Sequence, residues 1–188
     1  MKQLISFLFV TLLLIIGCNN ESELTSPVEN NTIQEPNWIA LPQAEGLYVN
    51  TEYNDTRNWD GKKSGTPLSI NASYYGGPFG LVTINSSLST ERNSYTGIRT
   101  LSMTLETNST VVTFGPEQVF NIPLKYNVTF TGVDLSGINP VTVQFAYIAA
   151  DGSVQYAVND GIVVDVATGK LGVINARIPH FSRYGFVN

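Results

Sequence analysis

Two residue types that support much covalent and metal chemistry are scarce in this chain, which has one histidine, His180, and one cysteine, Cys18. Zinc, iron and copper sites use several thiolate and imidazole ligands, so such a site cannot be assembled from these two residues. A serine triad also needs a histidine as general base, and His180 would have to be that base for any serine nucleophile. The aspartates of the C-terminal third lack the D-x-D-x-D spacing of a calcium loop. We therefore expect no metal site and no enzyme that turns over external substrates.

Aromatic side chains offer a different kind of chemistry, the stacking of sugar rings. Trp59, Tyr74 and Tyr75 could form a platform for such rings through their flat apolar faces. The segment Gly76-Gly77-Pro78 would place the two tyrosines on a loop. The alternative interpretation is that these aromatic rings pack in the core or on a sheet face. A carbohydrate-binding surface module is one candidate function.

The charge of the chain excludes one class of partner. The sequence has 10 basic and 15 acidic residues, which give a net charge of -5. Nucleic-acid binding needs clustered Lys and Arg to neutralise phosphates. We expect no nucleic-acid partner.

The N-terminal residues have the pattern of an export signal. A basic start precedes an apolar run over residues 4–16, which is shorter than the roughly 20 apolar residues of a membrane-spanning helix. This pattern predicts a signal peptide over residues 1–17. Ile15-Ile16-Gly17-Cys18 resembles the lipobox of bacterial lipoproteins, where a small residue precedes the cysteine. The resemblance implies cleavage before Cys18 and a covalent diacylglycerol and N-acyl lipid, such as palmitate, on this residue.

The segment after the lipobox is acidic and poor in apolar residues. Residues 19–60 contain eight acidic residues and one basic residue. Residues 18–36 cannot bury enough apolar surface to offset chain entropy, so we expect a flexible acidic tether. Asn19 in place of aspartate argues against retention at the inner membrane, and Glu21 and Glu23 resemble the acidic export patches of surface lipoproteins in Bacteroidetes-like bacteria. We expect a lipid-anchored protein of the bacterial cell envelope, at the outer membrane and exposed at the cell surface.

Apolar residues become frequent again near Asn37, where we expect the folded domain, residues 37–188, to begin. Whether residues 37–65 are part of its core or form an ordered arm is left open. Beyond them no window keeps the spacing of an amphipathic helix, whereas alternation of apolar and polar residues predicts strands. The predicted strands cover residues 67–73, 79–85, 100–107, 110–114, 124–130, 141–147, 154–158, 162–166, 171–178 and 180–187.

The connections between the last strands have the residues of tight turns. Asp151-Gly152, Asp160-Gly161 and Thr168-Gly169 supply the positive φ that two-residue hairpin turns need. Short strands at this spacing are typical of a sandwich. We therefore predict an all-β fold, a single antiparallel β-sandwich of roughly nine or ten short strands after the lipidated tether.

Two stretches resemble a known domain family over residues 100–188. Residues 114–117, with the sequence FGPE, are similar to a segment of the β-sandwich domain shared by ankyrins, netrin receptors and zonula occludens proteins, which also occurs in bacterial surface lipoproteins. Residues 164–169, VDVATG, and the HFS-x-Y segment at residues 180–184 resemble the end of those bacterial domains. The resemblance implies the same sandwich fold.

The resemblance also implies a candidate reaction. In some animal members of the superfamily a His-Phe-Ser tripeptide cleaves itself between Phe and Ser, and here the tripeptide is His180-Phe181-Ser182. Ser182 Oγ would attack the carbonyl carbon of Phe181 in an N-to-O acyl shift, His180 would move the proton, and water would hydrolyse the ester. A strained peptide bond would assist the reaction. In the alternative interpretation His180 hydrogen-bonds at a strand end, Phe181 fills the core and Ser182 lies on the opposite face.

We therefore expect a lipid-anchored extracytoplasmic β-sandwich that acts as an interaction or structural module. Its expected partners are the membrane, through the lipid on Cys18, and a protein or a glycan. We expect no cofactor apart from this covalent lipid. The alternatives are a carbohydrate-binding surface module and self-cleavage between Phe181 and Ser182.

Overall fold

A computed structural model of the chain describes residues 36–46, 52–149 and 151–188. The predicted signal peptide, Cys18 and the tether up to residue 35 lie outside the described residues. Those described contain eleven strands and no helix. The strands are β1 (Glu52–Asp60), β2 (Gly65–Tyr75), β3 (Leu81–Thr90), β4 (Ile98–Glu106), β5 (Val112–Gly115), β6 (Val119–Thr131), β7 (Gln144–Ile148), β8 (Val154–Tyr156), β9 (Gly161–Asp165), β10 (Lys170–His180) and β11 (Arg183–Val187).

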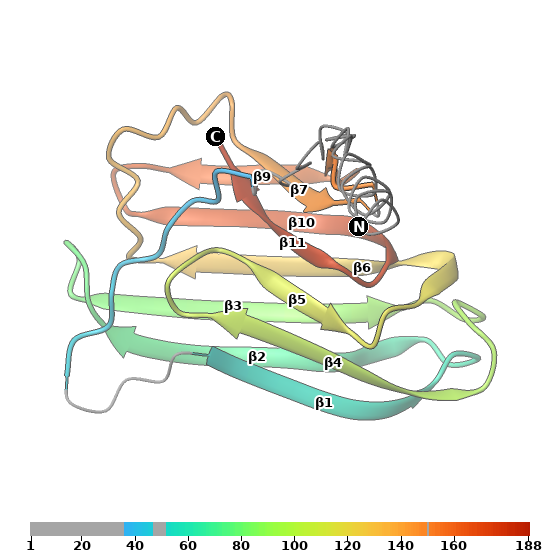
Figure 1. Ribbon diagram of the computed structural model, residues 1–188. Helices are drawn as coiled ribbons and strands as arrows, with labels where there is room; N and C mark the ends of the chain where they lie inside the picture. Colours follow the sequence, from blue (N-terminus) through green and yellow to red (C-terminus); the bar gives the residue numbers. More distant parts are fainter. Residues whose placement is uncertain (1–35, 47–51, 150) are drawn as a thin grey trace, which may run out of the picture. The chain divides into compact units, whose positions relative to one another are not determined.

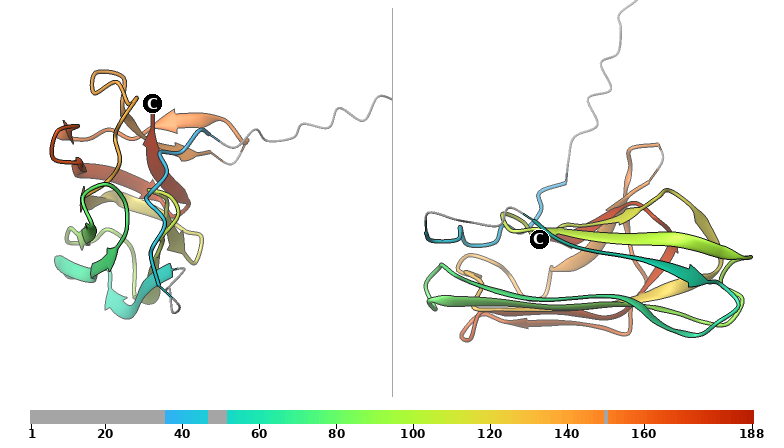
Figure 2. Two further views of the ribbon diagram at one scale, coloured as in Figure 1. Left: turned by 90° about the vertical axis from the view of Figure 1, so that its left-hand side faces the viewer. Right: turned by 90° about the horizontal axis from the view of Figure 1, so that it is seen from below.

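The strands form two antiparallel sheets that pack face to face, as the right-hand view of Figure 2 shows. The six-stranded sheet has the order β1-β4-β5-β11-β7-β8, and the five-stranded sheet has the order β2-β3-β6-β10-β9. In Figure 1 the five-stranded sheet lies behind the six-stranded one. The predicted antiparallel β-sandwich is confirmed.

The alternating sequence pattern explains the core. From residue 101 in β4 and from residue 124 in β6, every second side chain is buried between the sheets, whereas those between them are partly exposed. The largest fully buried side chains are aromatic: Tyr126, Tyr184, Phe130, Phe145, Phe181 and Phe186. Together with the buried aliphatic side chains, these rings supply the burial of apolar surface that is the main favourable contribution to folding.

The segment before β1 is attached to the six-stranded sheet. Trp38 forms a bridge with Val187, and Ala40 forms one with Ser109. Ile39 and Leu41, only 5% and 4% exposed, belong to the hydrophobic core. β1 pairs with β4 along its whole length. Within residues 37–65, whose place the sequence left open, both residues 38–41 and β1 therefore belong to the sandwich.

Two predicted connections differ from the structure. The hairpin expected at Asp160-Gly161 is wrong, because β8 and β9 belong to different sheets. Ala157 N–H donates to Phe145 O of β7, but Val158 O accepts from Arg177 N–H of β10, so the chain changes sheets here. The predicted strand 180–187 is also divided, since β10 and β11 lie in different sheets.

Candidate functional site

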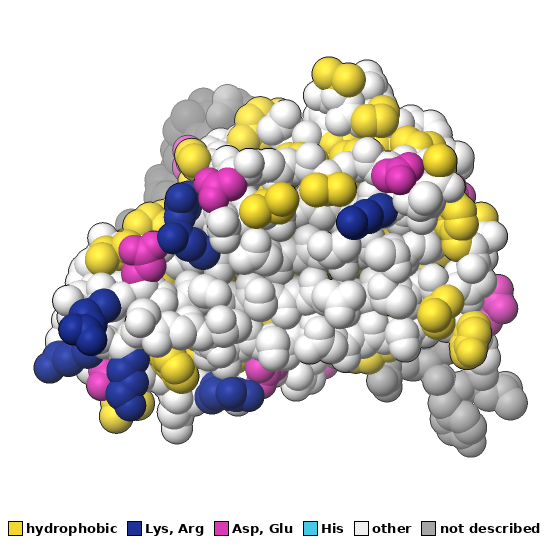
Figure 3. All heavy atoms as spheres, turned by 180° about the vertical axis from the view of Figure 1, so that it is seen from behind, with side chains coloured by type: hydrophobic (Ala, Val, Ile, Leu, Met, Phe, Trp, Pro, Cys, Tyr) yellow, Lys and Arg dark blue, Asp and Glu magenta, His cyan; other side chains and the backbone are white. Residues whose placement is uncertain are grey.

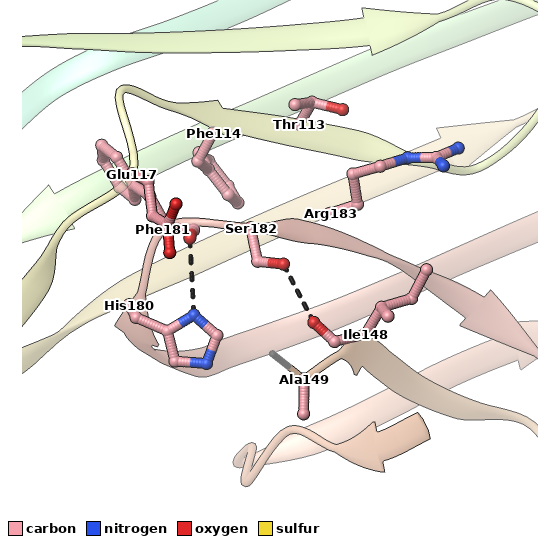
Figure 4. A pocket seen from close by; sticks show the side chains of 9 residues that line it. All are labelled: Thr113, Phe114, Glu117, Ile148, Ala149, His180, Phe181, Ser182 and Arg183. Carbon is pink, nitrogen blue, oxygen red and sulfur yellow. Dashed lines mark hydrogen bonds between the residues drawn. The ribbon is translucent and has the colours of Figure 1, made fainter. Parts of the chain in front are cut away.

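The tripeptide His180-Phe181-Ser182 occupies the corner where the chain passes from one sheet to the other. His180 ends β10 of the five-stranded sheet, and Arg183 begins β11 of the six-stranded sheet. Side chains of all three residues line a cavity of about 350 Å³, together with Glu117, Ile148 and others shown in Figure 4. The structure therefore brings the sequence-predicted residues together at a concave site.

Phe181 fixes this corner in the core. Its side chain is 2% exposed and stacks on Phe114 with a centroid separation of 5.4 Å, and it meets Phe120 edge to face at 4.9 Å. Its backbone N–H donates to Gln118 O at 2.9 Å. Aromatic pairs of this geometry add to the free energy gained from burial. Phe181 is therefore held both by its ring and by its backbone.

The hydroxyl of Ser182 is directed toward a neighbouring strand. Ser182 Oγ donates to Ile148 O of β7 at 3.0 Å, as Figure 4 shows. The carbonyl of the same residue accepts from Phe114 N–H of β5 at 3.0 Å. For attack on the Phe181 carbonyl, Oγ would have to leave its bond to Ile148 and rotate toward the preceding residue.

The imidazole of His180 lies on the other side of that carbonyl. Nδ1 is 3.4 Å from Phe181 O, and the ring meets Tyr147 edge to face with a centroid separation of 5.0 Å. Within the described part of the chain the imidazole makes no hydrogen bond to Ser182. An Nδ1–H tautomer would polarise the Phe181 carbonyl, but this placement does not yet make His180 a base for Ser182.

The backbone of the corner is not in a left-handed conformation. Among the described non-glycine residues, positive φ values occur at Asn93 and Asn175, not at Phe181 or Ser182. The corner is also fastened beyond Ser182, since Tyr184 Oη donates to His180 O at 2.7 Å. Burial, with a smaller contribution from Tyr147, raises the pKa of Tyr184 well above its usual value. Tyr184 therefore keeps its proton and its hydrogen bond over the neutral range.

The three aromatic residues predicted as a sugar platform do not lie together. Trp59 Nε1–H donates to Thr90 Oγ1 at 2.9 Å, and its ring covers Gly65 at the start of β2. Tyr74 and Tyr75 end the same strand, so they lie at the opposite end and not on a loop. Tyr74 is half-buried and donates to Pro42 O at 3.0 Å, whereas Tyr75 is 71% exposed. Only Tyr75 presents its ring freely to solvent.

Sequence reasoning missed a polar surface on the five-stranded sheet. The outward side chains at the centre of β2, β3 and β6 are all serine, threonine or asparagine, and we call this surface the neutral face. It comprises Ser69, Asn71, Ser73, Thr83, Asn85, Ser87, Asn127, Thr129 and Thr131. The sequence did contain a signal for this surface. In strands that were predicted from alternating apolar residues, the residues between the apolar ones are uncharged and polar, and they lie on the opposite face of the sheet.

The part of the chain that the structure describes contains no group of three His, Cys, Asp or Glu side chains placed to hold a metal ion. It also contains no helix that is long and apolar enough to cross a membrane.

Comparisons with known proteins do not assign the chain to a family. No protein-family model, no curated protein and no solved structure matched it. The resemblance of the FGPE and HFS-x-Y segments to the sandwich domain of ankyrins, netrin receptors and zonula occludens proteins stays a prediction.

Proposed function

We propose that this protein is a lipid-anchored β-sandwich of the bacterial cell envelope that acts outside the cytoplasm as an interaction or structural module. The observation that carries the proposal is the position of Cys18, which directly follows a signal-like apolar run and precedes the sandwich. Acyl chains on this residue would contribute about 0.8 kcal/mol for each buried methylene group, so several chains give a stable anchor. The outer membrane, with exposure at the cell surface, is the proposed location.

The arrangement of the corner favours a structural role over turnover of substrates. Ser182 donates its proton to a backbone carbonyl, and His180 lies against the carbonyl of Phe181. The carbonyl of Ser182 also accepts from Phe114 N–H of β5, so the corner between β10 and β11 is bonded to β5 and β7 of the six-stranded sheet. The polar groups of the tripeptide thus fasten the sandwich where the chain changes sheets.

Metabolic labelling with palmitate tests the lipid anchor. We expect label on the wild-type chain and none on a Cys18→Ala variant, because the sequence offers no other thiol. The variant should also leave the membrane fraction, while a Ser182→Ala control should remain labelled and membrane-bound. A wild-type chain without label, or a labelled Cys18→Ala chain, would refute the proposal.

Self-cleavage at Phe181-Ser182 is a second candidate function, favoured by one contact. Nδ1 of His180 is 3.4 Å from Phe181 O, where a donated proton would stabilise the oxyanion of an acyl shift. Mass spectrometry of the denatured chain after long incubation decides between the two roles. An intact chain supports the structural role, whereas loss of residues 182–188 from the wild type, but not from a Ser182→Ala variant, establishes cleavage.

A further inference from the structure

The neutral face is an ordered array because three neighbouring strands are paired in register. Ser69 of β2 lies opposite Ser87 of β3, which lies opposite Asn127 of β6. The next rows along the strands are Asn71, Asn85 and Thr129, followed by Ser73, Thr83 and Thr131. Strand spacing and rise make the array roughly 10 Å by 14 Å.

Most polar groups of this array are available to a ligand. Thr83 and Thr131 share a hydrogen bond of 2.6 Å, and Asn127 is bonded to Asn175 beside the array. In contrast, the side chains of Asn71 and Asn85 make no hydrogen bond within the described part of the chain, and both are exposed. Each asparagine presents a carbonyl acceptor and an amide donor side by side.

The centre of the array is hollowed and free of charge. A hollow of about 250 Å³ lies over it, lined among others by Asn71, Asn85 and Asn127. Figure 3 shows this side of the molecule, where Lys, Arg, Asp and Glu side chains surround a central area that has none. A ligand that covers the centre therefore meets hydroxyl and amide groups only.

One end of the array carries an exposed aromatic ring. Tyr75 follows Ser73 on the same face of β2 and pairs with Leu81 of β3, which is also exposed. Phe79, in the turn between these strands, is exposed as well. Apolar side chains accordingly gather at this end of the face in Figure 3. Exposed apolar side chains beside a polar array fit a ligand that has both flat apolar faces for stacking and hydroxyl groups.

We propose that the neutral face binds an uncharged polysaccharide, with one sugar ring stacked on Tyr75 and the next rings over Asn71 and Asn85. This inference rests on the proposed display of the sandwich at the envelope and names the ligand of the displayed module. Sugar hydroxyl groups both donate and accept, as do serine, threonine and asparagine side chains. The ligand has no formal charge because no charged side chain of the array could compensate for its desolvation.

A protein partner fits this surface less well. The centres of protein interfaces are enriched in aromatic residues, methionine and arginine, which the array lacks. The short side chains of the array also lose little rotamer freedom on binding, which favours a ligand held by many weak hydrogen bonds. A polyanion would favour the lysines and arginines at the edge of the face instead.

Affinity electrophoresis of the full lipoprotein in non-ionic detergent tests the proposal. The gels contain dextran, mannan, xylan or galactomannan as neutral polymers, or alginate as a charged polymer. We expect at least one neutral polymer to retard the protein to the same extent at low and high salt, and alginate not to retard it. Retardation by none of the neutral polymers, or by alginate alone, would overturn the proposal.

Substitutions assign the binding to the face. Asn71→Ala/Asn85→Ala should weaken retardation roughly tenfold, because several weak hydrogen bonds are lost. Tyr75→Ala should weaken it through the loss of stacking. Asn54→Ala/Asn58→Ala provides the matched control, since both asparagines are exposed on β1 of the other sheet. Equal loss in the control and the test variants would refute the site.

The two proposals fail separately. A palmitate-labelled chain that no neutral polymer retards would leave the envelope module standing and remove its polysaccharide ligand. A retarded chain without palmitate would keep the binding face and remove the lipid anchor.

Discussion

Two buried tyrosines of the core are held in different ways. The hydroxyl of Tyr126 is fully buried, and no described residue forms a hydrogen bond of regular geometry with it; the Ser86 side chain only opposes the rise of its pKa that burial causes. The hydroxyl of Tyr184 donates to His180 O at 2.7 Å. A buried polar group without a partner loses its bonds to water and gains none in return, so the two hydroxyls should contribute to stability with opposite signs.

Replacement by phenylalanine measures this difference. Tyr126→Phe should leave the free energy of unfolding unchanged or raise it by about 1 kcal/mol, because it removes an unsatisfied group. Tyr184→Phe should lower it by about 1 kcal/mol, because His180 O loses its donor. Urea denaturation of the two variants gives both values. A larger loss for Tyr126→Phe than for Tyr184→Phe would contradict the assignment of the hydrogen bonds.

At the scale of elements, strands with one clearly buried face could be predicted from the sequence. Leu101, Met103 and Leu105 are fully buried at alternate positions of β4, and this period identified the strand. β1 was not predicted, because seven of its nine positions are charged, asparagine or threonine. Its strand conformation results from pairing with β4, which a local pattern does not contain.

Neighbourhood in space was harder to predict than strand location. A turn signal such as Asp160-Gly161 marks a change of direction but does not state which sheet the next strand joins. The tripeptide at residues 180–182 was recognised as a unit because its members are adjacent in the chain. Trp59 and Tyr75 were grouped by residue type alone, and β2 separates them by its full length.

The segment before β1 offers a test at this scale. Ile39 is buried beside β11, its N–H donates to Phe186 O at 2.8 Å, and its carbonyl accepts from Thr110 N–H at 3.0 Å. Ile39→Ala should therefore lower the free energy of unfolding by about 2 to 5 kcal/mol through loss of burial and formation of a cavity.

Val141→Ala is the matched control, because this side chain is 86% exposed. It should change the free energy of unfolding by no more than about 0.5 kcal/mol. Equal effects of the two substitutions in chemical denaturation would show that residues 38–41 do not pack in the sandwich.

At the scale of the whole molecule, charge contributes little to stability near neutral pH. The ion pairs of Arg57 with Asp55, Lys125 with Glu91 and Arg177 with Asp160 join side chains that are between 20% and 57% exposed. Such exposed pairs contribute little. Stability should depend mainly on the aromatic core, so the groups that make it sensitive to pH are the phenols within and beside that core.

Alkaline pH should therefore destabilise the sandwich. Burial raises the pKa of Tyr74 to about 12 and holds those of Tyr126 and Tyr184 well above the usual range. In the unfolded chain these tyrosines ionise near pH 10. Their protonated forms contribute stability that is fully present below about pH 10 and is lost as the pH rises toward the folded-state values.

Urea unfolding at stepped pH values measures this loss. The midpoint should stay constant between about pH 7 and 9 and fall from about pH 10 upward, with tyrosinate absorbance appearing as the chain unfolds. A Tyr126→Phe/Tyr184→Phe double variant should show a shallower fall. It lacks two of the buried phenols that, above about pH 10, stay protonated in the folded state but ionise in the unfolded state. The comparison concerns the slope with pH, so it does not depend on the stability of the variant at neutral pH. A midpoint that falls equally in the variant and the parent would place the alkaline sensitivity outside the core.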